Sequence, residues 1–180
     1  MKNIDKIKSN IIGLDMGLSL GRFFLGTEDL HFGYWPDGET PTSQNFALGQ
    51  KNHSKLIMDT IPKGTKRILD VGSGSGSLAL KLLNAGYDVD CVIPSEYLAE
   101  AVKQKLNGKG KIHICKFEDF FCDESYDVII FSESFQYVNI VDSLEKVEKI
   151  LHPLGPLLIC GFFSRDVPEK SLMGGGHSWV

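Results

Sequence analysis

From residue 67 onward, short apolar runs rich in β-branched residues alternate with longer stretches whose apolar residues recur at helical spacing. Short runs of this kind are typical of strands buried on both faces, and the longer stretches are typical of amphipathic helices. Strands that alternate with helices form right-handed βαβ units, so the pattern predicts an α/β fold with a doubly wound, mostly parallel sheet. We expect strands over residues 67–71, 89–93, 111–115, 127–131 and 157–163, and helices over residues 77–85, 96–106 and 141–151.

The first fifty residues have a different pattern. Residues 4–25 are compatible with one or two helices, and a turn-rich aromatic segment follows at residues 31–38. A further helix is expected near Gln50. We interpret residues 1–50 as a helical and aromatic cap that covers a ligand site on the α/β domain. The glycines expected to interrupt the N-terminal helical stretch are Gly13, Gly17 and Gly21.

The α/β domain is assigned to residues 51–180, and its last expected strand ends at residue 163. Sheets of this class usually gain two more strands after the fifth, one of them antiparallel, whereas here a glycine tract follows at residues 174–176. We therefore expect five parallel strands, a poorly packed glycine tract, and a chain that is a fragment, because an exposed sheet edge favours aggregation.

Composition narrows the choice of partners. The chain of 180 residues has a formal net charge of −4 and no dense basic run, which argues against nucleic acid as a partner. The most apolar N-terminal stretch, residues 11–25, contains Asp15 and Arg22, so we expect no membrane span. The four cysteines form no CxxC pair, and we expect reduced thiols, a cytoplasmic location and no metal site.

A glycine-rich turn follows the first expected strand. Residues 70–76 read Asp-Val-Gly-Ser-Gly-Ser-Gly, and such a turn between strand and helix lets the backbone approach a ligand. Residues 74–79 also fit the GxGxxG/A pattern for dinucleotides, although that fit starts two residues late. Asp70 favours a different ligand, because its carboxylate would repel a pyrophosphate and attract a cationic amino-acid tail and a sulfonium.

The spacing Asp70-x-Gly72-x-Gly74-x-Gly76 resembles the first motif of class I S-adenosylmethionine-dependent methyltransferases, which have a Rossmann-like fold. The resemblance continues in residues 116–120, 126–135 and 151–155. Within that superfamily the chain is most similar to the small-molecule branch that contains cyclopropane-fatty-acid synthases. The resemblance implies methyl transfer from S-adenosylmethionine to a small or lipid-like acceptor by in-line displacement.

The resemblance also implies roles for individual residues. The glycine turn would hold the methionine and ribose parts of the cofactor, Phe117 would stack near the adenine, and Glu118 would accept a hydrogen bond from the exocyclic amine. Tyr34 or Trp35, with Gln50, would close over the methionine end. The acid that usually ends the second strand is replaced by Ile93. The expected cofactor-binding residues are Asp70, Gly72, Ser73, Gly74, Gly76, Ser95, Glu96, Phe117, Glu118, Tyr34, Trp35 and Gln50.

No residue can be assigned as catalytic from the sequence, because aligning an acceptor with an activated methyl group does not require a base. His31 and Glu133 are the candidates, whereas His53 is expected at the surface of a helix and His113 to be structural. Two alternative functions stay open: an oxidoreductase of the NAD type, and an inactive protein that binds S-adenosylmethionine.

One departure separates the chain from cyclopropane synthases. Those enzymes hold bicarbonate with a cysteine of the N-terminal segment and a Glu-His pair after the fourth strand. The matching positions here are Gly33, Gln136 and Tyr137, which offer no carboxylate. We expect methyl transfer without cyclopropanation.

Overall fold

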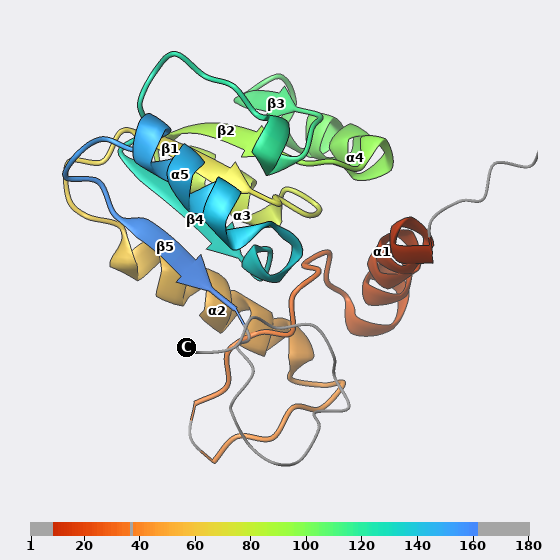
Figure 1. The fold of residues 1–180 in the computed structure, drawn as a ribbon. Helices are drawn as coiled ribbons and strands as arrows, with labels where there is room; N and C mark the ends of the chain where they lie inside the picture. Colours follow the sequence, from red (N-terminus) through yellow and green to blue (C-terminus); the bar gives the residue numbers. More distant parts are fainter. Residues whose placement is uncertain (1–8, 37, 162–180) are drawn as a thin grey trace, which may run out of the picture.

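The computed structural model describes residues 9–36 and 38–161. In this part of the chain, five parallel strands form one sheet with the order β3-β2-β1-β4-β5 (Figure 1). The expected doubly wound parallel sheet is therefore confirmed, with strand ends that shift by one or two residues. The expected residues 162–163 of the last strand and the tract at residues 174–176 lie outside the described residues. The strands are β1 (Arg67–Val71), β2 (Asp88–Val92), β3 (Lys111–His113), β4 (Val128–Ser132) and β5 (Leu157–Cys160).

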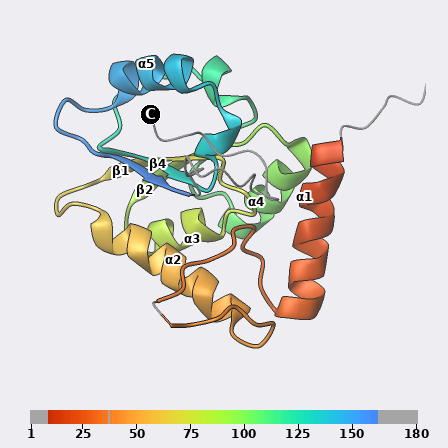
Figure 2. The same cartoon turned by 60° about the horizontal axis from the view of Figure 1, so that its bottom comes forward.

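Helices cover both faces of the sheet (Figure 2). On one face, α2, α3 and α4 pack with Ile68, Val128 and Ile130 in one apolar cluster. On the other face, α5 packs with Leu69 and Ile129 in a second cluster. Neighbouring residues of β1 and β4 thus face opposite clusters, as the two-residue period of a strand requires. The helices are α2 (Phe46–Thr60), α3 (Ser77–Asn84), α4 (Glu96–Leu106) and α5 (Ile140–Ile150).

The N-terminal helix α1 (Ser9–Leu20) is continuous through Gly13 and Gly17. The expectation that these two glycines interrupt a helix is wrong, since a helical glycine costs only about 1 kcal/mol and tertiary packing can offset it. Leu18 is buried in the cluster of α2, α3 and α4. At Gly21 the chain changes to a short π-helix, Gly21–Leu25. Residues 4–8 of the expected helical stretch lie outside the described residues.

The strand order by itself indicates where a ligand would bind. Strand β1 has β2 on one side and β4 on the other, so the chain crosses over in opposite directions from the carboxyl ends of β1 and β4. Ligands of doubly wound sheets bind in the crevice at this reversal.

The four cysteines are free thiols. Within residues 9–36 and 38–161, no helix is both long enough and apolar enough to cross a membrane.

Candidate cofactor site at the carboxyl edge of the sheet

The glycine turn leaves the end of β1 and leads into α3, as predicted. Gly72, Gly74 and Gly76 all have positive φ angles, of 76°, 55° and 76°, which side chains other than glycine rarely tolerate. A Cβ atom at position 72 would lie 2.4 Å from the Cβ atom of Ser134. Gly72 is therefore required by packing against the loop after β4, in addition to any approach of a ligand.

Asp70 lies in β1 just before this turn and is 1% exposed. Neither of its carboxylate oxygens has a hydrogen-bond partner among the described residues, although both are buried. Burial raises the pKa of this carboxyl to about 7, and the nearby Ser73 side chain offsets part of the rise although it makes no hydrogen bond to the carboxylate. The hydroxyl of Ser73 donates to the Asp70 main-chain oxygen, at 2.8 Å. A buried carboxylate without partners is costly, and it fits a ligand that brings a cationic or hydrogen-bond-donating group.

Two of the expected cofactor-binding residues follow the end of β2. Ser95 is buried and caps α4, because its Oγ accepts a hydrogen bond from the Leu98 N–H at 3.2 Å. Glu96 is exposed in the first turn of α4. The capping role accounts for a hydroxyl residue at position 95 without a ligand, which the sequence interpretation did not consider.

The two residues expected at the adenine follow β3 in a short 3₁₀ helix, Phe117–Asp119. Phe117 is buried, and its ring meets the edge of the Phe131 ring at a centroid distance of 5.2 Å. Glu118 Oε1 accepts a hydrogen bond from the Asn139 N–H at 2.9 Å. This contact links the segment after β3 to the start of α5 and leaves Oε2 of Glu118 for a further donor.

Residues 27–35, which we call the capping segment, are tied down by Gln50 of α2. The Gln50 side chain accepts a hydrogen bond from the Thr27 hydroxyl at 2.5 Å and donates to the main-chain oxygens of Asp29 and His31 at 3.0 and 2.6 Å. Gln50 is 1% exposed, so these bonds are made in a buried setting. Its side chain orders the capping segment, a role that the sequence interpretation had not given it.

Further contacts draw the capping segment over the glycine turn. Leu30 Cδ1 lies 3.6 Å from the position of a Cβ atom at Gly74. Glu28 pairs with Lys105 of α4 at 2.5 Å, and Asp29 pairs with Lys81 of α3 at 3.3 Å. The capping segment is thus anchored on both helices that follow the strands of the site.

The aromatic residues of this segment have different surroundings. Tyr34 is 47% exposed. The indole of Trp35 packs on α2, where a Cβ atom at Gly49 would lie 2.4 Å from it. Gly33 has φ of 104° and packs on the main chain of Gly49 and Gln50, so position 33 has no room for a side chain.

The capping segment brings His31 close to two other polar residues, His53 and Glu133. The two imidazole rings stack with a centroid distance of 4.2 Å, and His53 Nε2 lies 3.9 Å from Glu133 Oε1. The expectation that His53 is at the surface is wrong: it is 3% exposed, because α2 turns this position toward the sheet rather than toward solvent. No pattern in the sequence links these three residues, which come from segments far apart along the chain.

Burial governs the protonation of this group. Desolvation, followed by the charge of His53, lowers the pKa of His31 to about 4. Desolvation also lowers the pKa of His53 and raises the pKa of Glu133. Both imidazoles are therefore neutral near pH 7. Glu133 has a φ angle of 52°, a left-handed conformation that is strained for glutamate.

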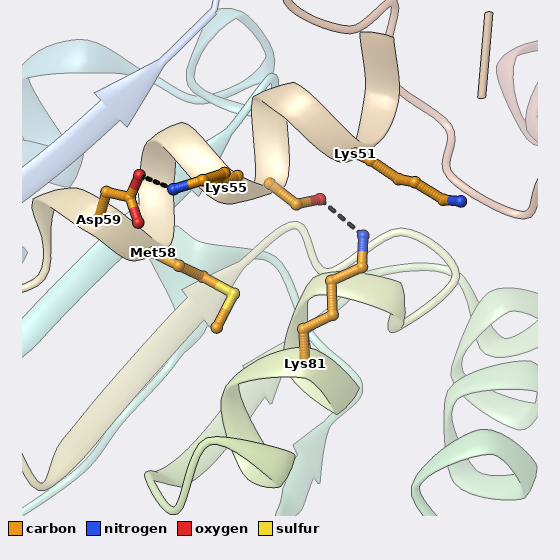
Figure 3. A pocket seen from close by; sticks show the side chains of 6 residues that line it. Lys51, Lys55, Met58, Asp59 and Lys81 are labelled. Atoms are coloured by element: carbon orange, nitrogen blue, oxygen red, sulfur yellow. Dashed lines mark hydrogen bonds and ion pairs between the residues drawn. The ribbon is translucent and has the colours of Figure 1, made fainter. Parts of the chain in front are cut away.

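A shallow pocket of about 270 Å³ lies apart from this edge, between α2 and α3 (Figure 3). Lys51, Lys55 and Lys81 line it together with Met58 and Asp59. Lys55 pairs with Asp59, and Lys81 donates to Ser54 at 2.7 Å. These contacts partner two of the three lysines within the protein, so the pocket gives no reason to move the ligand site from the strand ends.

Comparison with known proteins relates this arrangement to one family. The sequence matches the family described as methyltransferase domain over residues 69–159. A demethylmenaquinone methyltransferase from Clavibacter sepedonicus is 29% identical over 113 residues, 59% of this chain and 45% of the relative. A glycine/sarcosine/dimethylglycine N-methyltransferase from Actinopolyspora halophila is 25% identical over 157 residues, 83% of this chain and 27% of the relative.

A solved structure extends the likeness to the fold. Geranyl diphosphate C-methyltransferase from Streptomyces coelicolor A3(2), in complex with Mg²⁺, geranyl-S-thiolodiphosphate and S-adenosyl-L-homocysteine, superimposes with a TM-score of 0.68. The match has 18% sequence identity and covers 79% of this chain and 59% of that chain. The chain spans about half the length of the curated relatives it matches.

Proposed function

This chain belongs to the methyltransferase-domain family, and on that premise we propose that it transfers a methyl group from S-adenosylmethionine to a small-molecule acceptor. The observation that carries the proposal is the buried carboxylate of Asp70, which has no partner among the described residues and stands beside three glycines of positive φ. A cofactor with an ammonium group and a sulfonium supplies the positive charge that this carboxylate lacks.

The remaining cofactor contacts are proposed on the same edge. Gly72, Gly74 and the main chain of Ser73 would hold the methionine and ribose parts. Phe117 would contribute one wall of the adenine site. Glu118 would accept a hydrogen bond from the exocyclic amine through the carboxylate oxygen that Asn139 does not use. S-adenosylmethionine carries its methyl group already activated on sulfur, so the protein has to orient the acceptor and exclude water.

The capping segment is suited to that task. Its main chain is fixed by Gln50, and its acidic residues Glu28 and Asp29 are anchored on Lys105 and Lys81. We propose that the acceptor binds between the capping segment and the end of β4, where the side chain of Glu133 lies. The acceptor would be a small molecule, since relatives of this chain are named for a menaquinone precursor and for glycine derivatives.

Asp70 also disfavours the alternative function, an NAD-dependent oxidoreductase. A buried carboxylate at the end of β1 would repel a dinucleotide pyrophosphate. Titration of the protein with S-adenosylhomocysteine and, separately, with NAD⁺ decides between them. We expect heat of binding with the first ligand alone, and saturable binding of NAD⁺ alone would overturn the proposal.

Methyl transfer itself is tested with radiolabelled S-adenosylmethionine. The acceptor panel comprises quinols, primary and secondary amines, isoprenoid diphosphates and unsaturated phospholipid. We expect label in one of the first three classes and no cyclopropane ring in the lipid, because Gly33 has no room for a side chain and Gln136 is not a carboxylate. Cofactor binding without transfer to any acceptor would support the inactive alternative.

A further inference from the structure

One group of polar side chains is not used by the proposed cofactor site. His31 comes from the capping segment, His53 from α2, and Glu133 from the residue directly after β4. One potential ligand atom from each residue lies within 4.8 Å of the other two. The structure thus assembles two imidazoles and a carboxylate from segments far apart along the chain.

The two imidazoles have polar atoms that the protein leaves unused. Nδ1 of His31 and Nδ1 of His53 are buried and have no hydrogen-bond partner in the described part of the chain. Nε2 of His53, the nitrogen near Glu133, lies 3.2 Å from the Cys160 thiol, a contact that a metal ion at Nε2 would replace. His53 is 3% exposed, and the side chain of His31 is 11% exposed. Burying such atoms without a partner costs roughly 1–3 kcal/mol each, so their retention points to a ligand.

The third residue is held in place at both ends. The Phe32 N–H donates to Glu133 Oε2 at 3.3 Å, and the Gln136 amide donates to the Glu133 main-chain oxygen at 2.8 Å. These bonds maintain a left-handed φ of 52°, which is unfavourable for glutamate and which directs its side chain toward the histidines. Strained residues of this kind concentrate at functional sites.

We propose that His31, His53 and Glu133 bind one divalent transition-metal ion, with Zn²⁺ as the reference case. Two neutral imidazoles and one carboxylate form a ligand set of catalytic zinc sites, in which a fourth position stays open. Because ligand atoms lie about 2.0–2.2 Å from Zn²⁺, loading would draw these side chains together by roughly 1 Å. Hard ions such as Mg²⁺ and Ca²⁺ prefer oxygen ligands and would bind poorly here.

The position of this site indicates that the metal ion would bind the methyl acceptor, an inference that rests on the proposed function. Glu133 directly precedes Ser134, which packs against Gly72 of the glycine turn. An ion held by Glu133 would therefore lie beside the proposed cofactor, on the side of the capping segment. Its open position would accept an oxygen or nitrogen atom of the methyl acceptor and favour the deprotonated form of that group.

The test measures metal directly. Untagged protein is stripped with chelator, dialysed, incubated with Zn²⁺, and analysed by elemental mass spectrometry and by competition with a chromophoric chelator. We expect one equivalent of Zn²⁺ and at least a tenfold loss of affinity in each of His31→Gln and Glu133→Gln. The matched controls His113→Gln and His152→Gln should bind like the wild type, since neither residue belongs to the cluster.

Substitution with Co²⁺ adds a readout that a merely structural role would not produce. We expect visible absorption bands of four- or five-coordinate Co²⁺, lost in Glu133→Gln. Absence of a tight equivalent in the wild type, or equal affinity in all four variants, would overturn the site. Circular dichroism melts confirm that each variant is folded.

The same samples separate this inference from the proposed function. S-adenosylhomocysteine affinity should stay within threefold of the wild type in His31→Gln and Glu133→Gln. If the protein binds Zn²⁺ but not the cofactor, the metal site stands and the proposed methyltransferase function is rejected. If it binds the cofactor but not Zn²⁺, the proposed function stands and the metal site is rejected.

Discussion

Two aspartates lie on neighbouring strands of the sheet, both buried, and only one is satisfied by the protein. Asp90 of β2 accepts hydrogen bonds from the Tyr126 hydroxyl at 2.7 Å and from Arg67 at 2.9 Å. Asp70 of β1 is 1% exposed and has no partner for either carboxylate oxygen among the described residues. A carboxylate that the fold needs is paired within the fold, whereas one that the fold leaves unpaired indicates a ligand.

The surroundings of the two residues fit this difference. Arg67 also stacks over the Tyr126 ring at 4.4 Å and pairs with Glu124, so Asp90 belongs to a closed network. Asp70 instead precedes the glycine turn, at the edge where the strand order reverses. Substitutions at the two positions should therefore have opposite consequences for stability and for ligand binding.

The largest effect is expected for Asp90→Asn. Removing this charge takes away the buried partner of Arg67 and leaves only the exposed carboxylate of Glu124, which should lower the free energy of unfolding by about 3 kcal/mol. Urea unfolding measures this value. A loss below about 1 kcal/mol would mean that the network around Asp90 is not a stabilising element.

Asp70→Asn should act in the opposite direction and depend on pH. The pKa of Asp70 is raised from its ordinary 3.8 to about 7, so the folded state keeps a proton that the unfolded state releases between these values. Stability of the wild type therefore falls as pH rises through this window. The variant lacks that loss and should gain stability over the wild type, by up to a few kcal/mol, as pH rises from 4 to 8. Thermal melts across this range test the prediction, and parallel curves would refute it.

Glu118→Ala should weaken ligand binding, in addition to removing the hydrogen bond from the Asn139 N–H within the fold. Loss of a hydrogen bond to a charged acceptor should weaken cofactor binding by about 1–3 kcal/mol. S-adenosylmethionine and S-adenosylhomocysteine should be affected alike, because both carry the adenine. Calorimetric titration of the two ligands measures this, and a selective effect would place Glu118 elsewhere.

The smallest effect is expected for Ser95→Ala. Loss of the cap on α4 should lower the free energy of unfolding by about 1 kcal/mol. If Ser95 also contacts the ribose, cofactor affinity falls as well, and the capping-preserving variant Ser95→Asp separates the two roles. Unchanged stability in Ser95→Ala would contradict the capping role.

The sequence predicted the sheet better than it predicted the cap. Strands such as β4 are continuous apolar runs, and the glycine spacing after β1 is local, so both can be recognised along the chain. The capping segment is held by contacts between distant residues, such as Gln50 with Asp29 and Leu30 with Gly74. A single sequence carries no signal for such pairs.

The same limit explains the error at His53. Its burial depends on which side of α2 faces the sheet, and α2 has polar residues on both sides of position 53. The cluster with His31 and Glu133 exists only in the folded protein, because its three residues come from three separate segments. The prediction of no metal site rested on the cysteines alone and did not include this cluster.

We propose that the carboxylate of Asp70 binds a ligand, whereas the carboxylate of Asp90 is satisfied within the fold. Calorimetric titration of S-adenosylhomocysteine at pH 8 into wild type, Asp70→Asn and Asp90→Asn, at a temperature where all three are folded, tests it most directly. We expect saturable binding by the wild type, affinity at least tenfold weaker for Asp70→Asn, and wild-type affinity for Asp90→Asn. Equal affinity of Asp70→Asn and the wild type would contradict the account.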